Sequence, residues 1–260
     1  MKKIDKKIIF ASGGTGGHIF PAIGAMQHFI KQGFKAKMVT DSRGEQYIKN
    51  NLEVRFYILN TDTPFNKRNY KKFISYTKIF FSIIKSLFFL KSEKPNIVFG
   101  LGGYASFPIC IAAKILNIPL VIYENNYVLG RANKFLLPFS KKIFTTTNEI
   151  HKFPEKYKKK VIKVGHILRE EVINYSQVSK QNIDAFFSII ILGGSQGAEI
   201  FGLIIPAVIK KINEMGYKIK IYHQCIKQQK ESLIDFYEKN KIQNEVFEFS
   251  NNILKYILES

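Results

Sequence analysis

The segment KIIFASGGTGGHIFPA, residues 7–22, sets the pattern that the rest of the chain repeats. A short apolar run at 7–11 is typical of a strand, SGGTGGH forms a glycine loop, and 21–32 predicts a helix that Gly33 ends. Glycines let backbone amides approach a phosphate, and the start of the helix adds a favourable partial charge. The segment therefore predicts a β-loop-α unit with an anion site; the alternative is a tight turn without a ligand.

Two common nucleotide-binding patterns are absent from this loop. The dinucleotide fingerprint would need glycine at position 19, where the chain has Ile19, and the GK[ST] of a P-loop occurs nowhere in the sequence. A hydride-transfer enzyme and a P-loop ATPase are both disfavoured.

Strand and helix signals alternate along the chain, which predicts an α/β fold with parallel, doubly wound sheets. The polar stretch GHILREEVINYSQVSKQN, from residue 165, interrupts this alternation. We expect one domain at 1–165 and a second at 166–260 with three strands only. The expected strands are 7–11, 37–40, 55–59, 96–99, 120–123, 142–145, 161–164, 186–192, 218–223 and 245–249, and the expected helices are 21–32, 44–50, 70–90, 108–116, 131–137 and 198–215.

Two more glycine loops follow strands, GLGGYASFP at 100–108 and LGGSQGAE at 192–199. In an open parallel sheet, the loops after the strands line the ligand crevice. The loops at 12–18, 100–107 and 124–130 should therefore face one cleft, and the loop at 192–199 should serve the second domain in the same way.

Composition limits the class of protein. Of the 260 residues, 46% are hydrophobic, which indicates a folded chain. The formal net charge of +20 would attract an anionic partner; the alternative is that the charge only reflects a lysine-rich genome. Nothing besides charge supports nucleic-acid binding, so we expect no nucleic acid as a partner. The two cysteines, Cys110 and Cys225, form no metal-binding or disulfide pattern, which fits a reducing cytoplasm.

The motifs together resemble the MurG family, in order and in approximate spacing. The segments that carry the resemblance are GGTGGHIFPA at 13–22, GLGGYASFP at 100–108, YENN with GRANK at 123–134, GHILR at 165–169, GGSQGA at 193–198 and YHQ at 222–224. The family usually has HEQN and GNPVR where this chain has YENN and GHILR. Glu124, Asn126 and Arg169 keep the family pattern, whereas Tyr123, Asn125, His166 and Ile167 depart from it.

The resemblance implies a GT-B fold, with two Rossmann-like domains around a cleft, and an inverting, metal-independent transferase. Such an enzyme moves N-acetylglucosamine from UDP-N-acetylglucosamine to undecaprenyl-pyrophosphoryl-N-acetylmuramyl-pentapeptide in peptidoglycan synthesis, as lipid I becomes lipid II. It needs no cofactor and attaches peripherally to the cytoplasmic face of the inner membrane. Expected partners are the two substrates, an anionic membrane surface and other cell-wall enzymes.

The resemblance also assigns roles to particular residues. Substrate would contact Thr15, Gly16, Gly17, Tyr104, Asn126, Arg169 and Ser195, with Ser195 and its neighbouring amides on the pyrophosphate of UDP. The base is His18 or Glu124, since the reaction must remove a proton from the acceptor hydroxyl. His18 could instead stabilise its loop, Glu124 could be a structural carboxylate, and Tyr104 could simply pack at the surface.

The chain ends where the family continues into further donor-binding elements. We therefore expect an incomplete donor site and an open sheet edge. The alternative function is a non-catalytic or half-enzyme acceptor-binding protein that needs a separate donor chain.

One segment suggests membrane contact. Residues 70–91 interleave apolar side chains with Lys71, Lys72, Lys78, Lys85 and Lys91, a pattern typical of a basic amphipathic helix in a membrane interface. The alternative is a helix that faces the core. Because lysines interrupt and bound this apolar window, we expect no membrane-spanning segment.

Overall fold

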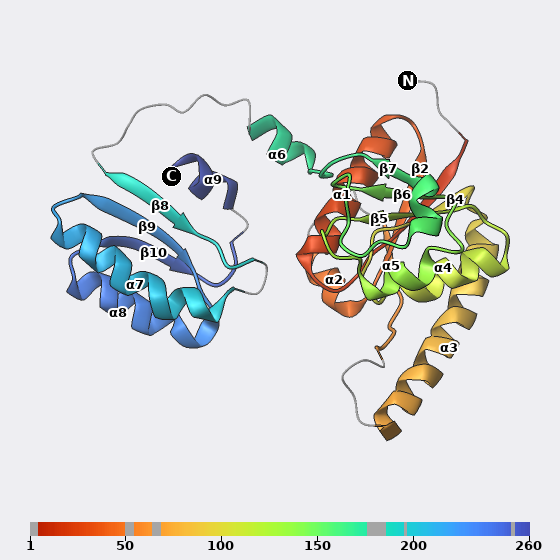
Figure 1. Cartoon of the computed structure of the whole chain (residues 1–260), viewed down its shortest axis with the longest axis horizontal. Helices are drawn as coiled ribbons and strands as arrows, with labels where there is room; N and C mark the ends of the chain where they lie inside the picture. Colours follow the sequence, from red (N-terminus) through yellow and green to blue (C-terminus); the bar gives the residue numbers. More distant parts are fainter. Residues whose placement is uncertain (1–4, 50–54, 64–68, 176–185, 195–196, 251–252) are drawn as a thin grey trace. The chain divides into compact units, whose positions relative to one another are not determined.

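The computed structural model describes residues 5–49, 55–63, 69–175, 186–194, 197–250 and 253–260 (Figure 1). The chain divides into two compact units, Met1–Glu171 and Val172–Ser260. Each unit is an α/β layer structure with a parallel sheet, as the sequence predicts. Each is described by itself below.

The first unit is built on a seven-stranded sheet of order β3-β2-β1-β4-β5-β6-β7, and all neighbouring strands are parallel. The order reverses between β1 and β4, where Ala11 lies opposite Gly100. The crevice beyond the carboxyl ends of these strands is the usual ligand site of such a sheet. The strands are β1 (Lys7–Ala11), β2 (Lys35–Thr40), β3 (Phe56–Ile58), β4 (Ile97–Gly100), β5 (Leu120–Glu124), β6 (Lys142–Thr145) and β7 (Val161–Lys163).

Helices cover this sheet on both faces, so its strands are apolar on both sides. Along β1, Ile9 and Ala11 join the core on one face, while Ile8 and Phe10 join the core on the other. The helices of the first unit are α1 (Gly16–Lys31), α2 (Ser42–Ile48), α3 (Asn69–Glu93), α4 (Ser106–Ile115), α5 (Arg131–Leu136) and the 3₁₀ helix η1 (Glu155–Lys160). Helix α6 (Glu170–Tyr175) begins in the first unit and ends in the second.

The second unit has a three-stranded parallel sheet of order β10-β9-β8, which confirms the predicted strand count for the described residues. Its main core gathers Ile191, Ile221 and Tyr237, and a smaller cluster of Tyr222, Phe247 and Tyr256 lies apart from it. The elements are β8 (Phe187–Ile191), α7 (Glu199–Glu214), β9 (Ile219–Gln224), η2 (Lys227–Gln229), α8 (Lys230–Lys239), β10 (Gln243–Phe247) and α9 (Ile253–Leu258).

The first helix begins earlier than its sequence suggests. The prediction placed its start at Pro21, but α1 starts at Gly16 and carries Pro21 inside it. Gly16 is buried, and a Cβ there would lie 2.7 Å from the Phe20 ring, so close packing favours glycine in this turn. Tertiary packing here overrides the weak helix propensity of glycine and proline. Gly16, Gly17 and His18 therefore form the first helical turn.

The segment after β7 packs on the first unit. The Tyr123 hydroxyl donates to the Gly165 carbonyl (3.1 Å) and accepts from the Ile167 amide (3.3 Å). The Arg169 guanidinium lies 4.2 Å from the centre of the Phe20 ring. The units consequently divide between Glu171 and Val172, six residues beyond the expected boundary at 165.

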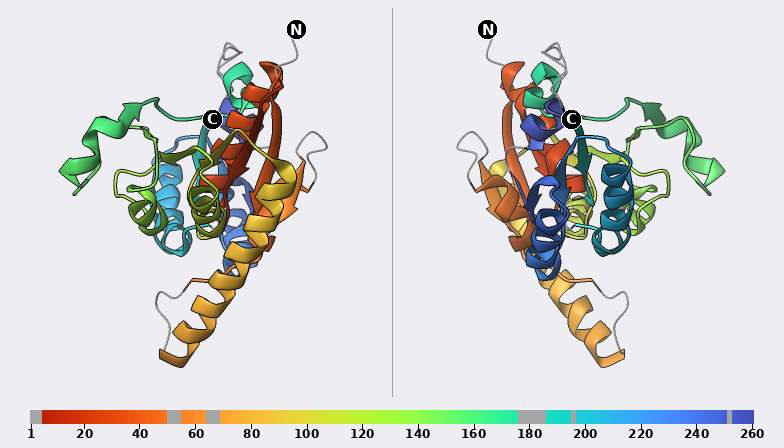
Figure 2. Two further views of the ribbon diagram at one scale, coloured as in Figure 1. Left: turned by 90° about the vertical axis from the view of Figure 1, so that its right-hand side faces the viewer. Right: turned by 90° about the vertical axis from the view of Figure 1, so that its left-hand side faces the viewer.

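Helix α3 is the segment on which the expectation of no membrane-spanning segment depends. By length and composition alone, Tyr70–Glu93 is long and apolar enough to cross a membrane, and 22% of its most apolar window is buried. The expectation that it does not span stays a prediction. Near its carboxyl end, Leu87, Phe89 and Leu90 pack against the core, and its amino-terminal half extends away from the sheet (Figures 1 and 2).

Candidate active site

The first glycine loop is held by Asp41, which directly follows β2 and is 6% exposed. Asp41 Oδ1 accepts hydrogen bonds from the amides of Gly14 (2.9 Å) and Gly44 (3.0 Å), and Oδ2 accepts from Arg43 Nη2 (2.8 Å). Burial by itself would raise the pKa of Asp41, but the hydrogen bonds from Gly14, Arg43 and Gly44 outweigh it and hold the pKa below its ordinary value. The carboxylate thus ties the loop to the start of α2.

The first and second glycine loops touch through their backbones. A Cβ on Gly103 would lie 2.1 Å from the Gly13 carbonyl oxygen, and a Cβ on Gly102 would lie 2.8 Å from His18 Nδ1. Both glycines have positive φ, +78° and +90°. Glycine is therefore required here for two reasons, backbone conformation and space beside the histidine.

His18 has a defined tautomer. Its Nδ1 lies 3.1 Å from the Leu101 carbonyl oxygen, which can only accept, so Nδ1 carries the hydrogen and Nε2 keeps its lone pair. Burial lowers the pKa of His18, while the charge of Glu124 and the Leu101 carbonyl act in the opposite direction. The result is a neutral imidazole at neutral pH, the form that a general base needs.

Glu124 ends β5 and is 1% exposed. Oε1 accepts from the amide and the side chain of Asn126 (both 3.1 Å), and Oε2 accepts from the Gly130 amide (2.8 Å) and Asn133 Nδ2 (3.0 Å). These four bonds satisfy the carboxylate and fix the loop from 124 to 130.

Three loops meet at one cavity of about 260 Å³ in the first unit. It is lined by His18 from α1, Tyr104 from the second glycine loop, and Glu124 and Asn126 from the loop after β5. The structure therefore brings together four of the residues that the sequence assigned to the site.

The remaining assigned residues have different positions. Thr15 is the exposed residue before α1, and its carbonyl accepts from the amides of His18 and Ile19. The Gly17 carbonyl accepts from Asn125 Nδ2 (2.7 Å), which joins the first loop to the loop after β5. Arg169 packs on Phe20 and pairs with Glu171. Ser195 lies outside the described residues.

In the second unit, Gln224 organises the third glycine loop. Its Oε1 accepts from the Gly193 amide (3.2 Å), and its Nε2 donates to the Glu248 carbonyl (3.2 Å). Neighbouring His223 is fully buried with Nδ1 2.8 Å from the Tyr237 hydroxyl, and burial lowers its pKa to about 4. Nδ1 of His223 thus has a partner within the core, whereas its buried Nε2 has no hydrogen-bond partner among the described residues.

The sequence interpretation did not assign to the site four residues that build these loops, Asp41, Asn125, Asn133 and Gln224, although Asn125 and Gln224 lie in two of the quoted motifs. Asp41 carried a usable signal, because it follows a strand at the same sheet edge as the glycine loops. Among the residues that the structure describes, no group of three or more His, Cys, Asp or Glu side chains could hold a metal ion.

Two Rossmann-like units, each with a glycine loop after its first strand, define the GT-B class of glycosyltransferases. Residues 8–145 match the glycosyltransferase family 28 N-terminal domain, and residues 188–260 match the C-terminal domain of the same family. The chain belongs to the MurG family of glycosyltransferases.

The similar proteins agree with this. A UDP-N-acetylglucosamine–N-acetylmuramyl-(pentapeptide) pyrophosphoryl-undecaprenol N-acetylglucosamine transferase of Rickettsia canadensis is 35% identical over 95% of this chain and 69% of its own length. The enzyme of the same name from Pelagibacter ubique is 36% identical over 98% of this chain and 70% of its own length.

Solved structures show the same fold. MurG of Acinetobacter baumannii superposes with a TM-score of 0.69 at 23% identity, covering 98% of this chain and 71% of that one. UDP-GlcNAc 2-epimerase of Neisseria meningitidis superposes with a TM-score of 0.63 at 17% identity, covering 97% of this chain and 74% of that one.

Proposed function

We propose that this protein transfers N-acetylglucosamine from UDP-N-acetylglucosamine to undecaprenyl-pyrophosphoryl-N-acetylmuramyl-pentapeptide. The relatives that carry this activity in their names support the choice of substrates. The observation that carries the mechanism is the tautomer of His18. Its Nδ1 hydrogen faces the Leu101 carbonyl, so Nε2 keeps a lone pair, and the residue lines the cavity.

In this reaction, His18 Nε2 takes the proton of the acceptor hydroxyl as its oxygen attacks the anomeric carbon of the donor. The bond from that carbon to the UDP oxygen breaks, and UDP leaves with the electron pair. A single displacement of this kind inverts the anomeric centre. Glu124 acts as a positioning residue, because it fixes the loop of Asn126 and its charge favours the imidazolium that forms.

The leaving pyrophosphate needs positive charge or hydrogen-bond donors, which we assign to protein groups rather than to a metal ion. The candidate donors are the amides of the third glycine loop at 193–198, with Ser195, and Arg169. The first-turn amides of α1 at Gly16 and Gly17, together with Thr15, are assigned to substrate phosphate, since a helix start favours an anion. Tyr104 lines the cavity of His18, and we assign it to the acceptor on that ground.

We further propose that α3 attaches the enzyme peripherally to the cytoplasmic face of the inner membrane. The helix places its small polar side chains toward the protein: Ser75 donates to Asp62, and Ser82 donates to the Asn60 carbonyl (2.8 Å). Most of its aromatic side chains are exposed instead, with Phe73 71% and Phe81 61% accessible, while Phe89 near the carboxyl end packs against the core. A helix that faced the core would bury the aromatic side chains, so this arrangement supports membrane contact.

Replacement of His18 by Gln tests the mechanism. We expect kcat of the full-length protein to fall about 10²–10⁴-fold, because the reaction loses its base. His28→Gln is the matched control, since His28 lies on the same helix and does not line the cavity. A rate unchanged by the His18 substitution would contradict the proposal.

A further inference from the structure

A second cavity lies in the first unit, beside the loop that follows β5. The connection from β6 to β7 folds back onto this loop: the His151 amide donates to the Tyr127 carbonyl (2.8 Å), and Val128 and His151 form a parallel bridge. The rings of Tyr127 and His151 stack, with centroids 6.1 Å apart and planes inclined by 29°. This contact forms one wall of the cavity.

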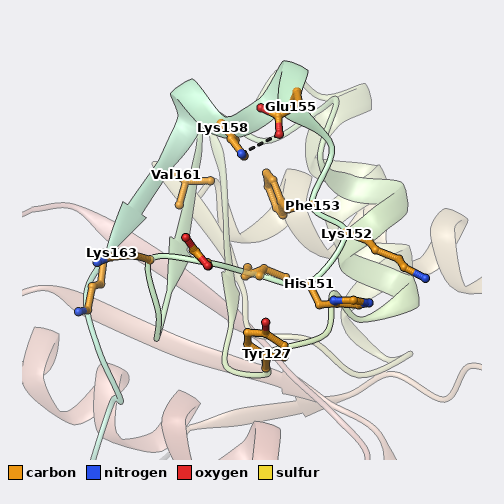
Figure 3. Close-up of a pocket in the computed structure, with 11 residues that line it drawn as sticks. Tyr127, His151, Lys152, Phe153, Glu155, Lys158, Val161 and Lys163 are labelled. Atoms are coloured by element: carbon orange, nitrogen blue, oxygen red, sulfur yellow. Dashed lines mark ion pairs between the residues drawn. The ribbon is translucent and has the colours of Figure 1, made fainter.

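The cavity, here the β6–β7 pocket, has a volume of about 810 Å³, within the size range of small-molecule sites. Figure 3 shows apolar side chains in it, Phe153 and Val161, with Lys163 on one side and Lys152 on the other. Its lining residues are Tyr127, Asn148, Glu149, Ile150, His151, Lys152, Phe153, Glu155, Lys158, Val161 and Lys163.

The charges of this pocket are unevenly satisfied. Lys158 pairs with Glu155 (2.7 Å), and nearby Lys160 donates to the carbonyls of Leu137 and Ser140, so these two lysines have partners. Within the described ranges of the chain, no carboxylate pairs with Lys152 or Lys163. Glu149, a carboxylate of the same lining, also has no ion pair within these ranges, so the unpaired charges are two lysines and one glutamate. This net positive set on an aromatic and aliphatic surface suits a short peptide that carries carboxylates.

The β6–β7 pocket adjoins the candidate active site. Asn126 lines the cavity of His18, and the next residue, Tyr127, lines the β6–β7 pocket. The Thr146 hydroxyl also donates to the Asn125 carbonyl (3.3 Å), which holds the start of the β6–β7 connection against this loop. A ligand that reaches past one loop could occupy both cavities.

We propose that the β6–β7 pocket binds the peptide portion of the acceptor, with Lys152 and Lys163 on its carboxylates. This inference rests on the proposed function, in which the acceptor sugar that reacts at His18 also bears the pentapeptide. The pocket would then contribute to acceptor affinity, and the chemical step would depend on His18.

The double variant Lys152→Gln/Lys163→Gln tests this in the full-length protein. With the pentapeptide acceptor, KM should rise about five- to tenfold at unchanged kcat, because two exposed ion pairs are lost. With the same lipid-linked acceptor lacking its peptide, KM should stay at the wild-type value. Lys159→Gln is the matched control, since Lys159 is an exposed lysine of η1 outside the pocket lining.

An equal rise in KM for both acceptors, or no rise for either, would overturn the proposal. Binding of the free pentapeptide, followed by NMR shifts of the Tyr127 and His151 rings, separates this inference from the proposed function. Shifts that the double variant abolishes would support the pocket even if the wild type transferred no sugar, and their absence in the wild type would refute it. Vesicle binding that fell in the double variant would instead assign the lysines to lipid.

Discussion

Glu124 is a single carboxylate on which the geometry of a whole loop depends, since it accepts four hydrogen bonds while buried. In Glu124→Gln, an amide NH₂ would replace one oxygen and face an existing donor such as the Gly130 amide. We expect a loss of about 2–4 kcal/mol in the free energy of unfolding, measured by urea denaturation. Glu149→Gln, at an exposed carboxylate, should change it little; an equal loss in both variants would contradict this role.

The partly buried imidazole of His18 gives both activity and stability a defined pH dependence. Its pKa in the folded protein is lowered below the ordinary 6.5, mainly by burial. The neutral base therefore stays available below pH 6.5, and kcat/KM should fall only as the pH drops through the lowered value. Because the unfolded chain binds the proton more readily, this contribution to stability is present above pH 6.5 and is lost as the pH falls.

The measurement is the pH profile of kcat/KM together with an NMR titration of the His18 ring. The two should give the same pKa, below that of the unfolded chain. A ring that titrates above 6.5 would contradict the burial argument.

At the scale of elements, the exposed phenylalanines of α3 lead to a prediction about its affinity for membranes. In the double variant Phe73→Ser/Phe81→Ser, vesicle affinity should fall at least about tenfold, because each Phe that is buried in the membrane contributes roughly 1.5–3 kcal/mol to binding. The free energy of unfolding should change little, since both side chains are exposed in the protein. Sedimentation with vesicles measures the affinity. Wild-type binding should increase with anionic lipid and decrease with salt; equal binding to neutral and anionic vesicles would refute the electrostatic part.

Gly194 of the third glycine loop can be compared with Gly216, a glycine outside this loop with a similar backbone conformation. Gly194 and Gly216 have φ of +75° and +87°, and a Cβ on either would meet no atom within 4 Å. Valine should therefore strain both positions alike. Only Gly194→Val should weaken UDP-N-acetylglucosamine binding, measured by calorimetry on the full-length protein, because a side chain there would block the approach of pyrophosphate. Equal affinity in the two variants would mean that the loop is a tight turn that does not bind the pyrophosphate.

Strands were predictable because apolar runs between turn signals leave few alternatives. The runs at 7–11 and 142–145 agree with β1 and β6 in full, and the other strand ends agree to within two residues. Helices α6, α8 and α9 were missed, although Leu233, Phe236 and Tyr237 of α8 have helical spacing. The glycine loops of the site could be predicted from local sequence. Asp41 could be placed at the same sheet edge, because it directly follows a strand, but its bond to the Gly14 amide could not be predicted, since it depends on which loops the folded sheet brings together. The bond of Asn133 to Glu124 also appears only in the folded structure.

At the scale of the whole molecule, the two units have separate cores, and each contains a histidine whose pKa is lowered by burial. His223 in the second unit has its pKa lowered by burial from 6.5 to about 4. Its contribution to stability is complete above pH 6.5 and decreases as the pH falls toward 4, since the unfolded chain takes up the proton first. Scanning calorimetry should therefore show a transition of the second unit that moves to lower temperature over this range.

His223→Gln should make that transition less sensitive to acid and leave the acid sensitivity that arises from His18 unchanged. One transition that responds identically to substitutions in both units would contradict the separation of the cores.

Gly24 and Leu168 are in contact, but we expect substitutions to be tolerated at Leu168 and not at Gly24. A Cβ on Gly24 would lie 2.6 Å from the carbonyl oxygen of Leu168, while the Leu168 side chain is half exposed. The segment is thus held by a backbone atom that every amino acid possesses, so a change of side chain at 168 leaves this contact intact. A single methyl group at 24 would displace the segment. The attachment of residues 165–171 is therefore encoded at the glycine, more than a hundred residues earlier in the chain.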